Sequence, residues 1–96
     1  MENNSALDVV LHQPLRTRIV AYLSTREEAT FTELKKLLDV TDGNLEAHIK
    51  KLRTADYVVT NKVKGDGRPQ TFYRLTDAGK AAFKQYVDQL QSLLNI

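Results

Sequence analysis

The chain has no cysteine, no tryptophan, two prolines and only two histidines among its 96 residues. Without cysteine it cannot form disulfides, thiolate metal sites or a thiol redox sensor, although this absence does not identify the compartment. The GDG at 65–67 lacks the strand-to-helix context of a phosphate-binding loop. Histidines and carboxylates at these spacings provide no pair of nucleophile and base. The sequence therefore predicts a protein that is not an enzyme and needs no cofactor.

Long apolar runs are also missing. The first 15 residues have no basic n-region, and Asp8, His12 and Pro14 interrupt their apolar stretch. They do not predict a signal peptide, and no segment is long enough to span a bilayer, so we expect a cytoplasmic protein. The length and a hydrophobic content of 42% predict one domain with a small core, for which an oligomer would be favourable.

The most informative part of the chain is a basic helix that leads into two short strands. Thr41 is placed to cap this helix, and Val40 and Leu45 have the spacing of a hydrophobic staple. Leu45, Ile49 and Leu52 recur at helical spacing and predict a buried stripe. His48 flanks the stripe and is expected to be packed rather than to bind a ligand.

The face opposite that stripe combines small and cationic residues. At about 100° of rotation per residue, it carries Gly43, Ala47, Lys50 and Thr54, with Asn44 and Lys51 along one flank. A helix in a major groove needs slim side chains near the bases and cations or amides that reach phosphates and base edges. A solvated surface face has the same composition, so this helix alone leaves both interpretations open.

Two runs of β-branched and aromatic residues follow, at 57–63 and 71–73, and predict a hairpin. Between them lies KGDGRPQ, and Lys62, Lys64 and Arg68 give this hairpin a positive tip. Arginine is favoured in narrow, A·T-rich minor grooves, where negative potential is concentrated. The alternative is an ordinary solvated turn.

Shorter helices precede the basic helix. FTELKKLLDV at 31–40 predicts one, with either Thr30 or Thr32 as its cap, and its tight connection to the next helix predicts a helix-turn-helix over 31–55. Another helix is expected over Pro14–Thr25 and a still shorter one over Ser5–Leu11, which together form an N-terminal helical region at 5–25.

A long helix is expected over 76–95, after the hairpin at 57–75, with Thr76 as its cap. Its apolar positions form a heptad-like seam of Phe83, Val87, Leu90 and Leu94, which Tyr86 and Leu93 widen. Because a helix of this length should extend beyond a small domain, we expect a second copy of the chain to cover the seam. The alternative is that the helix folds back entirely onto its own domain.

Positive charge is concentrated in the helix and hairpin. Residues 42–74 contain seven basic and four acidic residues, whereas the whole chain has a formal net charge of only +2. This local excess predicts that the helix and hairpin face a polyanion.

Two segments carry a family resemblance: FTELKKLLDVTDGNLEAHIKKLRTADYV and GRPQTFYRLTDAGKAAF. Together they resemble the winged helix-turn-helix transcriptional regulators related to the MarR and ArsR families. The resemblance implies a mainly α fold with a small β-hairpin and a long C-terminal helix for dimerisation, in a prokaryotic homodimer. The implied recognition-helix positions are Thr41, Asp42, Gly43, Asn44, Glu46, Ala47 and Lys50, and the implied wing position is Arg68. Relatives often have Ser and Arg where this chain has Glu46 and Ala47.

We therefore expect a sequence-specific regulator that binds double-stranded DNA as a homodimer, as a repressor at an operator. A winged helix that serves as a protein-interaction or assembly module is the rival hypothesis, because one fold hosts both functions. Control by a small-molecule effector, held at the dimer seam, is left open.

Overall fold

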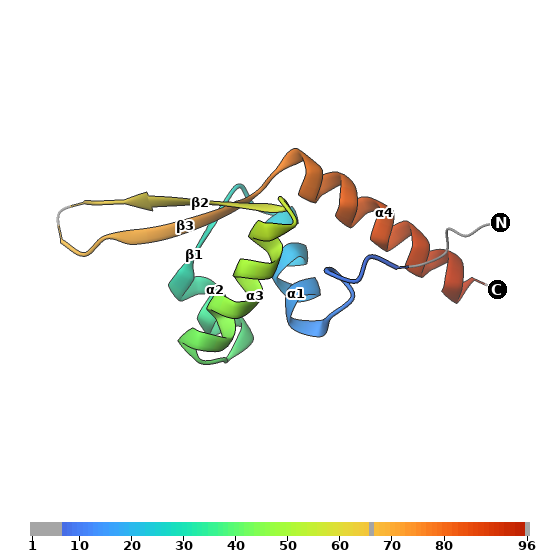
Figure 1. Ribbon diagram of the computed structural model, residues 1–96, viewed down its shortest axis with the longest axis horizontal. Coiled ribbons are helices and arrows are strands. Elements are labelled where there is room, and N and C mark those ends of the chain that lie inside the picture. Colours follow the sequence, from blue (N-terminus) through green and yellow to red (C-terminus); the bar gives the residue numbers. More distant parts are fainter. Residues whose placement is uncertain (1–6, 66, 96) are drawn as a thin grey trace.

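The computed structural model describes residues 7–65 and 67–95. In chain order its elements are α1 (Pro14–Ser24), β1 (Ala29–Thr30), α2 (Phe31–Leu38), α3 (Asp42–Thr54), β2 (Val58–Val63), β3 (Gln70–Leu75) and α4 (Asp77–Leu94). Figure 1 shows the hairpin of β2 and β3 projecting to one side, α4 to the other, and the three shorter helices grouped between them. The predicted mainly α winged helix-turn-helix fold, with its long C-terminal helix, is confirmed.

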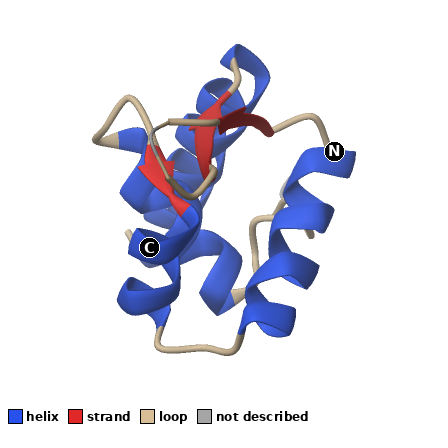
Figure 2. Cartoon of the chain, turned by 90° about the vertical axis from the view of Figure 1, so that its left-hand side faces the viewer, coloured by secondary structure: helices blue, strands red, loops and turns tan. Residues whose placement is uncertain are grey.

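The sheet contains one strand more than the sequence predicts. Its order is β1-β3-β2, with both pairings antiparallel. Ala29 of β1 pairs with Tyr73 of β3, and Thr30 pairs with Phe72. Two residues are too few to show the alternation that marks a strand, so sequence reasoning missed β1. The strands, drawn in red in Figure 2, form a small sheet beside the predominant helices.

Threonine caps start the three helices that follow β1. In each, the threonine hydroxyl accepts a hydrogen bond from the backbone N–H three residues later. The donor–acceptor distances are 3.0 Å for Glu33 and Thr30, 3.2 Å for Asn44 and Thr41, and 2.9 Å for Gly79 and Thr76. Glu33 also accepts from the backbone N–H of Thr30, which completes a capping box. The cap of α2 is therefore Thr30 and not Thr32.

Residues 9–11 form a turn and none of residues 7–13 is helical, so the helix expected over Ser5–Leu11 is wrong wherever the structure describes it; residues 5 and 6 lie outside the described part. The cause is the Asp8 carboxylate, which accepts hydrogen bonds from the backbone N–H of Val10 at 2.8 Å and of Leu11 at 3.2 Å. A side chain that bonds to the backbone two and three residues later competes with helix formation.

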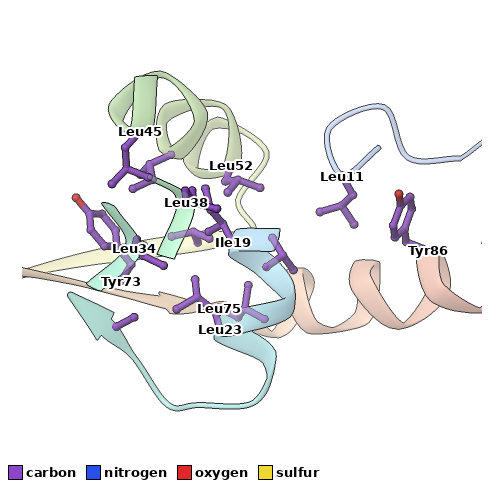
Figure 3. Packing of buried hydrophobic residues seen from close by; sticks show 14 residues of the cluster. Leu11, Ile19, Leu23, Leu34, Leu38, Leu45, Leu52, Tyr73, Leu75 and Tyr86 are labelled. Atoms are coloured by element: carbon purple, nitrogen blue, oxygen red, sulfur yellow. The ribbon is translucent and has the colours of Figure 1, made fainter. Parts of the chain in front are cut away.

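The core lies between α1, α2, α3 and one face of the sheet (Figure 3). Its buried apolar members on these elements are Ile19, Val20, Leu23, Ala29, Leu34, Leu38, Leu45, Ile49, Leu52, Val58, Tyr73 and Leu75. Figure 3 also shows Leu11 and Tyr86 facing each other at the α4 end of this cluster. Burying these side chains fixes α3 and the hairpin relative to each other.

Helix α4 is anchored to the start of the hairpin at Gly79. A Cβ atom added there would lie 2.2 Å from the carbonyl oxygen of Tyr57, so only glycine fits. The same carbonyl accepts from the backbone N–H of Thr76 at 3.0 Å. The Tyr57 hydroxyl donates to the Asp8 carboxylate. Burial, together with this hydrogen bond and the charge of Asp8, raises the pKa of Tyr57 to about 12. Tyr57 therefore joins the hairpin, α4 and the N-terminal turns.

The molecule is elongated, with principal extents of 54, 25 and 21 Å. Its radius of gyration is 14.6 Å, whereas a compact domain of this length would have about 12.5 Å. The hairpin tip and the C-terminal part of α4 account for the difference, because they project from opposite ends of the core (Figure 1).

Candidate nucleic-acid interface

The free face of α3 is exposed to solvent. Leu45, Ile49 and Leu52 are buried as predicted. All eight positions predicted for DNA contact on or beside this helix are exposed: Thr41, Asp42, Gly43, Asn44, Glu46, Ala47, Lys50 and Lys51. The core therefore takes up only one side of the helix and leaves the slim, cationic side to solvent.

Some polar groups at the start of α3 form contacts within the domain, and others are exposed to solvent. The Thr41 hydroxyl is engaged as the cap. Asp42 forms an ion pair with Lys35 of α2, with an N–O distance of 2.7 Å. Among the described residues, no side chain or backbone group bonds to the side-chain amide of Asn44. Asn44 can therefore offer both its donor and its acceptor to a base edge.

The hairpin, called the wing below, presents two different faces. Because side chains alternate along a strand, Thr60 and Lys62 share the face of buried Val58, and they pair across the sheet with Tyr73 and Thr71. This face adjoins α3 and is called the inner face. Val59, Val63, Phe72 and Arg74 alternate onto the outer face. Lys62 thus lies on the same side of the sheet as α3.

The positive tip of the wing lies apart from α3. Lys64 and Arg68 are exposed in the connection between β2 and β3, and Figure 1 shows this connection at the far end of the hairpin. The exposed residues of the helix and those of the tip thus form two separate groups, an arrangement that contact with two different grooves would require. The sequence-predicted residues form two groups, one on α3 and one on the wing.

His48 belongs to the support of α3 and not to its free face. Its Nδ1 atom lies 3.2 Å from the Nη1 atom of Arg16, and since arginine can only donate, the histidine nitrogen accepts. Arg16 also donates through Nε to the carbonyl of Val10 at 2.6 Å. Burial lowers the pKa of His48, and the charge of Arg16 lowers it further. This agrees with the packed role that the sequence predicts.

Residues 7–65 and 67–95 contain neither a metal-binding cluster nor a helix suited to cross a membrane. No cluster of three or more His, Cys, Asp or Glu side chains in these ranges is arranged to hold a metal ion. None of the described helices combines the length and the apolar character that crossing a membrane requires.

Comparison with known families identifies this arrangement. Residues 15–94 match the family model described as a winged helix DNA-binding domain. The chain belongs to this family. The matched range begins in α1 and ends with α4, so it includes the helix-turn-helix, the wing and the long helix.

Several relatives of this winged-helix chain extend the comparison. An uncharacterized protein of Methanocaldococcus jannaschii is 38% identical over 84 residues, which are 88% of this chain and 91% of that protein. The structure of a transcriptional regulator homologue from Pyrococcus horikoshii OT3 has a TM-score of 0.85 and 36% identity, over 90% of this chain and 85% of that one. A mutant MarR from E. coli complexed with operator DNA has a TM-score of 0.65 and 26% identity, over 79% of this chain and 57% of that one. These likenesses support a DNA-binding transcriptional regulator.

The structure buries part of the seam predicted on α4 of the winged-helix domain and leaves the rest exposed. Tyr86 is only 4% exposed, and its hydroxyl lies 2.9 Å from Nδ1 of His12, so it has almost no surface left for a partner chain. Phe83 and Leu90 are partly buried against the domain's own core, and Val87 is half-buried. Leu93 and Leu94 are 49% and 80% exposed. The helix therefore docks on its own domain near its start and leaves apolar surface near its end.

Sequence reasoning missed one cation of the winged-helix surface. Arg53 is exposed near the end of α3, beside the inner face of the wing. Its place beside the core stripe, four residues after Ile49, shows in the sequence, but the position of the wing next to it does not.

Proposed function

We propose that the chain is a sequence-specific regulator that represses transcription by occupying operator DNA as a homodimer. The observation that carries this proposal is the pairing of an exposed, slim face on α3 with a separate cationic wing tip. Helix α3 lies in a major groove, and the wing reaches the adjacent minor groove through Arg68. In a dimer, two recognition helices contact half-sites about 34 Å apart.

The proposed dimer forms through α4. Its seam consists of Leu93 and Leu94 with the exposed parts of Phe83, Val87 and Leu90. Exposed leucines on a helix that projects from the core support this assignment, since contiguous exposed apolar surface commonly marks an interface. A small-molecule effector at this seam, a cytoplasmic location and a prokaryotic source stay predictions.

The rival function is a protein-interaction module. It is favoured by the outer face of the wing, where Val59 is 38% and Val63 is 43% exposed. Salt dependence separates the two functions, because phosphate contacts release counterions and a mostly apolar contact does not. DNA affinity that falls steeply between low and moderate salt supports the proposed function, and a salt-insensitive protein complex without DNA binding would support the rival.

The wing role is tested at its tip. Changing Arg68 to alanine should weaken binding of the preferred duplex by about 1 to 2 kcal/mol, because a cation leaves the minor groove while an exposed tip contributes little to folding. Fluorescence anisotropy titration measures the effect. Arg26→Ala serves as the control, because this substitution also removes one positive charge, but outside the wing. Arg26 stacks over the Tyr22 ring of α1, with its Cζ 4.0 Å from the ring centroid. Equal affinities for the two variants would refute the wing contact.

The base contact is tested at Asn44. Its free amide should specify one base pair, so Asn44→Ala should relax preference at a single position of the site. Lys51→Ala should instead weaken binding to all sequences and reduce the salt slope by about 1. Competition among duplexes that differ at one position measures both effects. An Asn44→Ala protein with uniformly reduced affinity and unchanged preference would mean that Asn44 contacts only the backbone.

A further inference from the structure

A groove runs between α3 and β2. Lys50, Arg53 and Thr54 line it from the helix, and Val58, Thr60 and Tyr73 line it from the sheet. Its volume is about 730 Å³ and it opens broadly to solvent; this groove is called the channel below. It lies between the two elements that the proposed function assigns to neighbouring DNA grooves.

The geometry of a DNA duplex indicates which part of the duplex would lie in this channel. The major and minor grooves of B-DNA are separated by a single sugar-phosphate strand. A protein with its helix in one groove and its wing in the next therefore straddles that strand. We infer that the channel between α3 and β2 binds this phosphodiester strand, with Arg53 and Thr60 as phosphate contacts beside Lys50. The inference rests on the proposed function.

Arg53 is suited to this contact by its position beside the channel and by its exposure. No hydrogen bond or ion pair holds its guanidinium within residues 7–65 and 67–95. Burial raises the pKa of Tyr73, the charge of Glu46 raises it further, and the charge of Arg53 lowers it. Since Tyr73 lines the channel, the positive charge of the Arg53 guanidinium is felt inside the channel. A planar, permanently charged group in this place can bind a phosphate through two parallel hydrogen bonds.

Thr60 provides a second, independent observation. Its hydroxyl oxygen is buried and has no hydrogen-bond partner among the described residues. Buried polar groups normally find partners, and leaving one unpaired costs about 1 to 3 kcal/mol. Thr60 lies in the wall of the channel, so a phosphate bound there would be next to this residue. A bound phosphate would thus supply the missing acceptor.

Two carboxylates also line the channel and limit where the strand can lie. Asp56 follows the end of α3 with a φ of 65°, and its carbonyl accepts from the Thr76 hydroxyl, which places it beside the start of α4. Glu46 is two turns nearer the start of the helix than Arg53. Phosphates should therefore bind at the level of Lys50 and Arg53, between the two repelling groups.

The test compares Arg53 of α3, which lies beside the inner face of the wing, with Arg74 on its outer face. Arg53→Ala should weaken binding to every duplex on the order of 5- to 10-fold and lower the salt slope by about 1. Arg74→Ala removes the same charge from the outer face, opposite Val59, and should leave both quantities unchanged. Thr60→Val should weaken binding without changing the slope, because no charge is lost. Anisotropy titrations over a series of salt concentrations measure all three.

The outcomes separate this inference from the function on which it rests. A wild-type chain that shows no salt-dependent binding to any duplex would overturn the proposed function and this inference together. If the wild type binds but Arg53→Ala behaves like Arg74→Ala, the strand does not lie in this channel. If Thr60→Val matches the wild type while Arg53→Ala is impaired, the hydroxyl contact is overturned and the arginine contact is supported.

Discussion

Placing aspartate at Leu94 should separate the proposed dimer into monomers. Leu94 is 80% exposed in the single chain and lies in the projecting part of α4. In a dimer this side chain would be buried, and losing such a contact costs about 2 to 5 kcal/mol when the surroundings cannot collapse. An unpaired carboxylate in an apolar contact adds a further cost. Affinity for a two-half-site duplex should then fall, since a monomer reaches only one half-site.

Sedimentation measures this effect, and a neighbouring residue provides the control. Ser92 is exposed and lies on the opposite side of α4, so Ser92→Asp adds the same charge outside the seam. That variant should remain dimeric. Circular dichroism should show the same helix content in both variants, because Leu94 lies outside the domain's own core. A wild-type chain that is monomeric at micromolar concentration would show that the end of α4 is not the dimer seam.

Gly79→Ala should destabilise the domain by about 3 kcal/mol or leave it unfolded. The new methyl group would lie 2.2 Å from the Tyr57 carbonyl oxygen. Backbone cannot move aside as the end of a flexible side chain can. Relief of the clash would therefore shift α4 away from the wing and break the bond from the Thr76 N–H to that carbonyl.

A second glycine in a first helical turn gives the matched comparison. An added Cβ at Gly43 of α3 meets nothing within 4 Å, so Gly43→Ala should stabilise the fold by up to about 1 kcal/mol through helix propensity. Urea denaturation of both variants tests the pair. Equal stabilities would show that α4 does not dock on the wing through Gly79.

Features set within one helix could be predicted from the sequence. The Thr41 cap and the stripe of Leu45, Ile49 and Leu52 follow from spacing alone, because a helix places residues three and four apart on one side. The wing was predictable because its strands are six residues long and joined by a loop with two glycines. The exposed face of α3 then follows by exclusion from the core.

Features that depend on distant parts of the chain could not be predicted. The two residues of β1 become a strand only because Tyr73 and Phe72 lie beside them. Tyr86 has the spacing of a seam residue, but His12, which is 74 positions away, binds its hydroxyl inside the domain. The residues after Asp8 form a turn where the sequence predicts a helix, because the Asp8 carboxylate accepts hydrogen bonds from nearby backbone N–H groups.

The central claim is sequence-specific binding by a symmetric pair of recognition helices, and selection of bound duplexes from a random DNA pool tests it most directly. We predict enrichment of two inverted half-sites whose centres are about 34 Å apart, one helical turn of the duplex. In the selected sites, replacing Asn44 by alanine should relax the preference at one position of each half-site and leave the other positions enriched. Enrichment of no common sequence, or of a single half-site without its inverted copy, would contradict the account.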